Sequence, residues 1–252
     1  DHDQNILATA DSPVSVQNSK DGYSEQNPEE WINATLECLE GLKSKKPKEF
    51  METIAIGISG QMHGATLIDS SGEVIRPCIL WNDTRSHKEC EEFENQSIDV
   101  RSISGNITMP GFTAPKINWL KNNEIESFKK IHKVLLPKDY LRFYLTGDYY
   151  SEMSDASGTL WLDVKDRKWS EKLLSCSELD LKHMPTLVEG NQETGTLKNN
   201  IKDKFGFNNN VLVVGGAGDQ AAAAAGMGII NQKQSFISLG TSGVFFHQHK
   251  IF

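Results

Sequence analysis

The chain has 252 residues, 38% of them hydrophobic and 24% charged, and a net charge of −8. This composition suits a globular chain of one large or two small domains, long enough to bury a sizeable core. The acidic balance and the lack of a basic stripe argue against a nucleic-acid partner, and no apolar run approaches the ~20 residues of a membrane helix.

The start of the chain and its cysteines suggest where the protein works. The first residues are polar and acidic, so no signal peptide opens the chain. The four cysteines lie far apart without CxxC spacing, which favours free thiols in a reducing compartment. His87 and Cys90 have a helical i, i+3 spacing, but no second ligand pair lies nearby, so we expect no metal site. We therefore predict a cytoplasmic protein.

Helices and strands alternate along the chain. Residues 6–10 look like a strand that is entered partway, and Asn27 is a good N-cap for a helix with Pro28 at its first position. The later predicted elements are a β-rich run at 53–59, a hairpin of 65–68 with 73–80, helices over 85–94 and 114–121, a strand at 134–136, a helix over 137–145 ended by Gly147, a central strand at 211–214, a helix over 220–225, and strands at 235–239 and 244–246. This alternation predicts an α/β fold, and the hairpin makes its sheet mixed.

Two glycine-rich turns follow predicted strands late in the chain. The turn at 215–220 leads into an alanine-rich helix, and its glycines let a ligand come close to the backbone. Asp219 lies at that junction, where it can point into a crevice or serve as an ordinary N-cap. The turn at 238–243 offers N–H groups and hydroxyls to a phosphate, or is a plain β-hairpin turn.

Two earlier turns carry groups that suit a sugar. Residues 57–64 place Met62 and His63 in a glycine-flanked loop, where a ligand contact and a structural histidine are both open. Trp81 begins a run of Trp, Asn and Asp that can offer a ring face to sugar carbons and planar groups to hydroxyls. The alternative is that Asp83, or the threonine after it, caps the next helix.

Taken together and in this order, these turns resemble the sugar kinases of the FGGY family. The likeness rests on Gly-Gln-Met-His-Gly at 60–64, Trp-Asn-Asp at 81–83, Gly-Asp at 218–219 and Gly-Thr-Ser-Gly at 240–243. The segment at 111–123 resembles the first signature of the family, and the segments at 134–141 and 151–163 are similar to the same proteins. The resemblance therefore runs nearly end to end.

The resemblance implies a two-domain kinase of the actin and hexokinase type, with a ribonuclease-H-like α/β domain in each half and helices flanking a mixed central sheet. ATP and Mg²⁺ are the implied cofactors, and a small sugar is the implied substrate. Residues 1–252 would be the N-terminal, sugar-binding domain without its first strand and phosphate turn, and the C-terminal nucleotide-binding domain would be absent. We expect no kinase activity from this chain alone, and a homodimer of the longer protein is left open.

The resemblance also implies residue roles. The Met62–His63 pair resembles family members that phosphorylate D-xylulose to D-xylulose 5-phosphate, since glycerol kinases carry an Arg-Glu pair there. A kinase for gluconate, ribulose or glycerol, or a non-catalytic sugar-binding module, is the alternative. The implied general base is Asp219, the implied sugar contacts are Met62, His63, Trp81 and Gln220, which stands where some relatives have Asn, and the implied nucleotide-phosphate contacts are Gly240 and Thr241.

Overall fold

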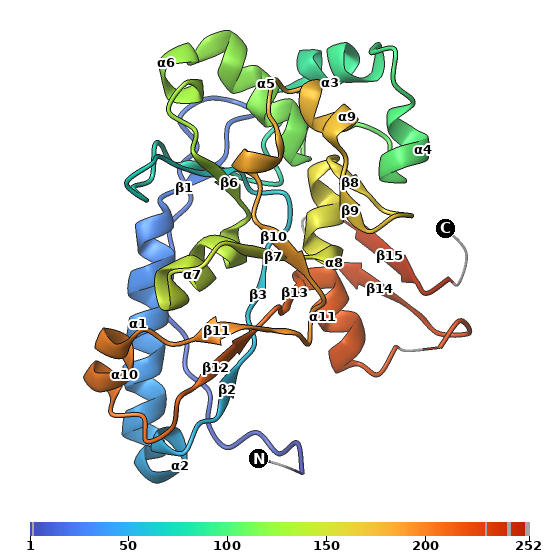
Figure 1. Cartoon of the computed structure of the whole chain (residues 1–252). Helices are drawn as coiled ribbons and strands as arrows, with labels where there is room; N and C mark the ends of the chain where they lie inside the picture. Colours follow the sequence, from blue (N-terminus) through green and yellow to red (C-terminus); the bar gives the residue numbers. More distant parts are fainter. Residues whose placement is uncertain (2, 230, 241–242, 250–252) are drawn as a thin grey trace.

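The computed structural model describes residues 1, 3–229, 231–240 and 243–249 (Figure 1). The helices are α1 Pro28–Lys45, α2 Pro47–Met51, α3 His87–Glu94, α4 Val100–Ser104, α5 Thr113–Asn123, α6 Ile125–Phe128, α7 Pro137–Thr146, α8 Met153–Ala156, α9 Glu171–Ser175, α10 Asn199–Phe205 and α11 Asp219–Gly226, with short 3₁₀ turns at Ser157–Thr159 and Leu181–His183. The strands are β1 Glu25–Gln26, β2 Ala55–Ile56, β3 Ser59–Gly60, β4 Thr66–Ile68, β5 Cys78–Ile79, β6 Lys133–Leu135, β7 Tyr150–Glu152, β8 Leu162–Asp163, β9 Lys168–Trp169, β10 Thr186–Val188, β11 Glu193–Thr196, β12 Leu212–Val214, β13 Ala217–Gly218, β14 Ser235–Leu239 and β15 Gly243–His247. The predicted α/β class is confirmed.

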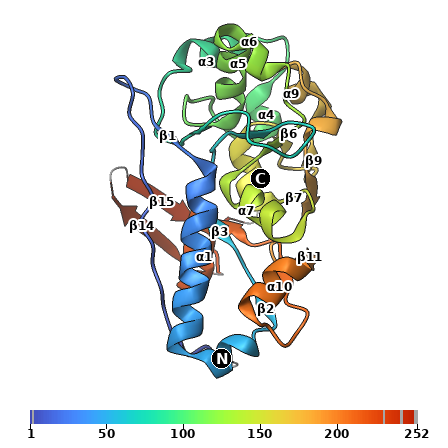
Figure 2. The same ribbon diagram turned by 90° about the vertical axis from the view of Figure 1, so that its left-hand side faces the viewer.

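The first helix begins where the sequence predicts. The Asn27 side chain accepts a hydrogen bond from the Glu29 N–H, and Pro28 occupies the first turn. The strand predicted at 6–10 is wrong, because this segment has no regular secondary structure and runs beside α1 instead of pairing in a sheet (Figure 2). The Lys45 ammonium on α1 donates to the Thr9 carbonyl and ties the segment there.

A pair of parallel segments carries the centre of the fold. β12 lies between β11 and β2, as predicted for a central strand, and β13 pairs in parallel with β3. Residues 57–58 separate β2 from β3, and residues 215–216 separate β12 from β13. The two breaks lie side by side, because Gly216 turns with φ of 75° beside Ile58. A Cβ at Gly216 would lie 2.0 Å from the Ile58 carbonyl oxygen, so only glycine fits there. The sheet region therefore consists of several small sheets among the described residues.

The predicted early hairpin forms only in part. β4 pairs with β6, not with the returning segment, which keeps single bridges from Ile68 to Val74 and from Ala65 to Ile79. The returning segment pairs through β5 with β1. The reason is that β6 offers β4 an extended antiparallel partner, with a register from Thr66↔Leu135 to Ile68↔Lys133.

Two apolar clusters support these elements. One lies among α5, β4, β6 and the segment around Trp161, which is fully buried. The other joins α1, α7 and α10 to β12, with Phe50, Phe205 and Phe207 in mutual ring contact. None of the helices in the described ranges has the length and apolarity that crossing a membrane requires.

The last described element is the antiparallel hairpin of β14 and β15, which lies beside α11 (Figure 1). Its strands have the predicted positions, and residues 241–242 of the turn between them lie outside the described residues. One face exposes Ile237 and Phe245, while Ser238 and Val244 on the other face are half-buried. The hairpin thus presents Ser238 and Val244 to the site described next.

Candidate functional site

A hollow of about 240 Å³ brings together every predicted site residue that the structure describes. Thr241 lies outside the described residues. The hollow also contains two residues that the sequence analysis did not single out, and these come from the β14–β15 hairpin. The residues that line it are Met62, His63, Trp81, Asp219, Gln220, Ser238, Gly240 and Val244.

Strand direction explains why residues so far apart in sequence meet. β3 and β13 are parallel neighbours, with Ser59 opposite Ala217. The carboxyl ends of parallel neighbours lie at one edge of a sheet, so the residues that follow them meet there. Met62 and Asp219 each follow one of these strands. A Cβ at Gly218 would lie 2.9 Å from the Met62 Cγ, so the glycine before Asp219 also makes room for Met62.

His63 is held firmly and is neutral. Its Nδ1 lies 2.7 Å from the Gly158 carbonyl oxygen. Its ring packs edge-on against the Phe112 ring, with 4.7 Å between the ring centroids. Burial lowers the pKa of His63 to about 4, although the Gly158 hydrogen bond opposes this effect. A neutral ring whose Nδ1 donates to a carbonyl leaves Nε2 as a hydrogen-bond acceptor. His63 can therefore accept a hydrogen bond from a ligand hydroxyl.

The His63 backbone is strained. Its φ of 68° is in the left-handed region, which a residue other than glycine adopts at a cost of roughly 1–3 kcal/mol. Such a conformation persists only where neighbouring contacts enforce it. Gly158 is one such neighbour, since a Cβ there would lie 2.5 Å from the His63 Nδ1.

Trp81 provides the aromatic side of the hollow and is 37% exposed. Asp83, which the sequence analysis grouped with Trp81, does not serve a ligand. It is buried, accepts the Ser24 N–H at 2.6 Å, and pairs with Arg85 at 2.7 Å. The capping alternative also fails for Asp83, because α3 starts later and its N-cap is Ser86.

Asp219 is the first residue of α11 and is exposed. Its Oδ1 accepts the Gln220 N–H at 2.9 Å, which leaves Oδ2 without a hydrogen-bond partner among the described residues. The Gln220 Oε1 atom is buried and also has no partner there. Buried polar atoms normally find a partner, so this amide is available to a ligand.

Below the Asp219 turn lies a fully buried charge network that sequence reasoning missed. The Lys138 ammonium is 2.6 Å from Asp139 Oδ1 and 3.2 Å from Asp155 Oδ2. Arg142 pairs with Asp139 at 3.0 Å and donates to the Gly215 carbonyl. Lys138, Asp139 and Asp155 lie in the segments at 134–141 and 151–163, which the sequence analysis used only as marks of family resemblance, and Arg142 follows the first of them.

The network reaches the turn directly. The Gly218 N–H is shared between Glu152 Oε1 at 3.2 Å and Ser154 Oγ at 3.1 Å. Burial raises the pKa of Asp155, and the neighbouring carboxylates of Asp139 and Glu152 add to this effect while Lys138 opposes it. Hydrogen bonds from buried charged groups restrain the backbone that they bind. The turn that presents Asp219 is therefore restrained by its hydrogen bonds to Glu152 and Ser154.

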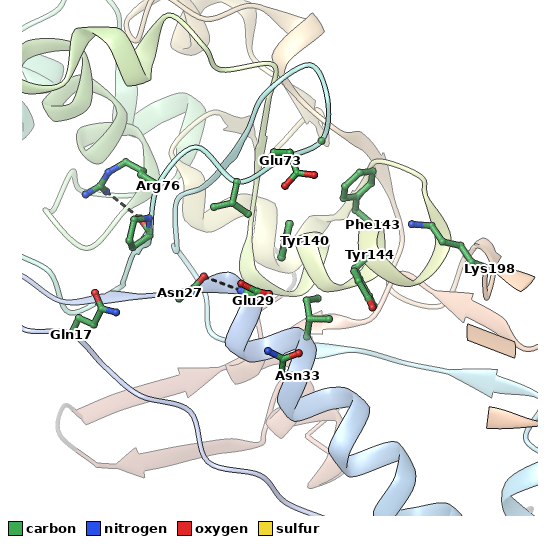
Figure 3. Close-up of a pocket in the computed structure, with 14 residues that line it drawn as sticks. Gln17, Asn27, Glu29, Asn33, Glu73, Arg76, Tyr140, Phe143, Tyr144 and Lys198 are labelled. Atoms are coloured by element: carbon green, nitrogen blue, oxygen red, sulfur yellow. Dashed lines mark hydrogen bonds between the residues drawn. The ribbon is translucent and has the colours of Figure 1, made fainter. Parts of the chain in front are cut away.

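A second hollow, of about 660 Å³, lies between α1 and α7 (Figure 3). Its side chains include Tyr140, Tyr144 and Glu73, and the Lys198 ammonium lies 5.4 Å from the centre of the Phe143 ring. None of the predicted site residues lines it. It is larger than the first hollow, but the parallel strands β3 and β13 do not end at it.

Comparison with known proteins identifies the class. Residues 1–226 match the N-terminal domain of the FGGY family of carbohydrate kinases, and the chain belongs to this family. It is 45% identical over 241 residues to the xylulose kinase of Escherichia coli strain K12, a match that covers 96% of this chain and 49% of that protein.

Solved structures agree on the fold. A crystal structure from Brucella ovis, described as a xyloylose kinase, superposes with a TM-score of 0.95 at 49% identity and covers 97% of this chain and 50% of that one. The glycerol kinase of Plasmodium falciparum with ADP has a TM-score of 0.85 at 25% identity, over 95% of this chain and 49% of its own. The chain therefore spans about half the length of these relatives.

Proposed function

We propose that this chain is the sugar-binding half of an ATP-dependent kinase that converts D-xylulose to D-xylulose 5-phosphate. The observation that carries the proposal is the meeting of Met62, His63, Trp81, Asp219 and Gln220 in one hollow. The similarity to proteins named xylulose kinase supports the choice of sugar. The proposal places the adenosine of ATP mainly on the other half of the longer kinase.

Each side chain in the hollow has a proposed task. The Trp81 ring covers the carbon chain of the sugar, and the neutral His63 Nε2 accepts a hydrogen bond from one of its hydroxyls. The Gln220 amide provides a further hydrogen-bonding group. Together these contacts orient one hydroxyl towards Asp219.

Asp219 is the proposed general base. Its carboxylate takes the proton of the oriented hydroxyl while the hydroxyl oxygen forms a bond to the γ-phosphorus of ATP. The bond from that phosphorus to the bridging oxygen breaks, and ADP leaves. Gly240 and Thr241 are proposed to hold phosphate oxygens through the hairpin turn.

The hollow is compatible with Mg²⁺ that is bound mainly through phosphates and water. No group of three His, Cys, Asp or Glu side chains in the described part of the chain could form a protein cage for a metal, whereas Mg²⁺ usually keeps several waters and few protein ligands. The Asp219 carboxylate is the oxygen donor in the hollow that could support the ion. Its chemistry there would be to neutralise phosphate charge.

The test is sugar choice. Binding of D-xylulose, D-ribulose, D-gluconate and glycerol to this chain is measured by calorimetry, and ADP release is measured in the longer kinase. D-xylulose should bind best, and the double variant Met62→Arg, His63→Glu should weaken its use, because groups shaped for one hydroxyl pattern are left unpaired with another. An unchanged kcat/KM for D-xylulose in that variant would refute the assignment of the pair, and better binding of glycerol or gluconate would favour the alternative kinases.

A further inference from the structure

The Lys116 side chain on α5 is fully buried. Its ammonium donates to the His63 carbonyl at 2.8 Å and to the Gly111 carbonyl at 2.7 Å. Among the residues that the structure describes it forms no ion pair. Burying an ammonium without a paired anion is unfavourable, so a lysine here needs a reason beyond packing.

The first carbonyl belongs to the strained residue of the sugar hollow. The His63 oxygen also accepts the Thr113 hydroxyl at 3.1 Å, so two donors from α5 converge on it. These bonds grip the peptide group that follows the left-handed His63 Cα. They are therefore among the contacts that enforce the conformation from which the imidazole points.

The second carbonyl leads to the other side of the hollow. Gly111 packs so closely on the Trp81 backbone that a Cβ at Gly111 would lie 2.6 Å from the Trp81 carbonyl oxygen. By holding the Gly111 carbonyl, Lys116 fixes the segment against which Trp81 rests. A single ammonium thus connects the two loops that carry the aromatic and imidazole walls.

We infer that Lys116 is a positioning residue that sets the spacing between His63 and Trp81 in the sugar hollow. It touches neither the hollow nor its ligand and acts through the two backbone carbonyls. This inference rests on the proposed function, because it assumes that the hollow takes the sugar. A lysine that only fills the core would act through its aliphatic stem, which methionine can replace.

The experiment compares Lys116→Met with Lys121→Met, a matched change on the same helix at a lysine that pairs with Glu178 on the surface. D-xylulose binding to the chain is measured by calorimetry. The ¹⁵N signals of the histidine rings are recorded in parallel, with His63→Gln to assign the His63 signal. Loss of positioning should raise the Kd of Lys116→Met about tenfold or more and move the His63 ring signal, whereas Lys121→Met should change neither.

A Lys116→Met variant that binds within about twofold of the unchanged chain, with an unmoved His63 signal, would overturn the inference. If Lys116→Met does not fold, Thr113→Val is used instead, because it removes the other donor to the His63 carbonyl. An unaltered Kd and His63 ring signal in Thr113→Val would also overturn the inference. If the unchanged chain binds no sugar, the proposed function fails. The His63 signal would then still decide whether Lys116 controls the histidine.

Discussion

The two hollows differ in size and in support, and support is the more telling property. The larger one is bordered by exposed side chains of α1, such as Glu29 and Asn33, and by half-buried side chains of α7. The smaller one lies where the parallel strands β3 and β13 end. A buried charge network binds the backbone before Asp219, and Lys116 binds the His63 carbonyl. A site that must orient a ligand needs such a second layer, because only supported groups hold one geometry.

The largest expected effect is on catalysis by the smaller hollow. Asp219→Asn should lower kcat of the longer kinase by about 10²–10⁴-fold and leave sugar affinity within a small factor, because the variant loses only the proton acceptor. Coupled ADP release measures kcat, and calorimetry measures affinity. The control is Glu73→Gln, which neutralises a carboxylate in the larger hollow. A kcat of Asp219→Asn within about threefold of the unchanged enzyme would rule out this residue as the base.

The next effect concerns the support of His63. In Gly158→Ala the new methyl group must displace the imidazole, since it would lie 2.6 Å from the His63 Cε1. We expect a loss of D-xylulose affinity of about 10–100-fold, measured by calorimetry, because a hydrogen bond to a buried partner is misplaced. Gly72→Ala is the control at the larger hollow, where the φ of 85° that glycine adopts freely would strain an alanine. It should reduce stability without changing affinity, and equal affinity losses in both variants would argue against a specific role for Gly158.

A third effect is on stability and distinguishes the buried Lys116 from Lys198, the half-buried lysine of the larger hollow. Burial lowers the pKa of Lys116 to about 7 from 10.5, with Cys78 and Asp83 opposing the shift and Arg85 adding to it. Because the folded-state pKa is the lower one, the unfolded chain binds the extra proton between these values, and the free energy of unfolding contributed by Lys116 rises with pH through that window.

The wild-type chain should therefore gain stability relative to Lys116→Met as the pH rises from about 7 to 10, by on the order of a few kcal/mol. Urea unfolding at several pH values measures the difference. Lys198→Met, in the larger hollow, should show the same trend more weakly, because Lys198 is less buried and its pKa is lowered less. A pH-independent difference between the wild-type chain and Lys116→Met would contradict the lowering of the Lys116 pKa by burial.

The smallest expected effect is an absence of change. Since the pKa of His63 is about 4, protonation of His63 should leave D-xylulose affinity unchanged between about pH 5 and 8 and lower it only as the ring protonates at lower pH. Calorimetry across this range tests the point, with His63→Gln as the variant that lacks the titration. A midpoint near the ordinary histidine value would show that His63 is more exposed to water than the fold indicates.

Local signals in the sequence predicted the elements well where one residue type decides the geometry. Asn27 with Pro28 predicted the start of α1, and Gly147 ends α7 as a left-handed cap. Pairing partners were harder, because the pattern of an apolar strand does not say which neighbour it will take. This is why β4 was expected to pair with the returning segment and pairs with β6 instead.

The same division holds for the candidate site. Met62, His63, Asp219 and Gln220 lie in or beside short glycine-containing turns, so sequence reasoning could find them. The groups that support it, such as Lys138, Glu152 and Lys116, lie on regular elements whose burial only the fold reveals. Asp83 shows the reverse case, because a polar residue inside a convincing motif turned out to belong to a buried ion pair.

The most direct test of the account is to map where D-xylulose binds. Backbone and side-chain NMR signals of the chain are recorded during titration with D-xylulose, and with sorbitol as a polyol control. We expect saturable shifts at the Trp81 indole and at the amides of Gly218, Asp219 and Gln220, with Tyr144 and Lys198 unmoved. Shifts that gather around Tyr144 and Lys198 and leave Asp219 and Trp81 unchanged would place the sugar in the larger hollow and contradict it.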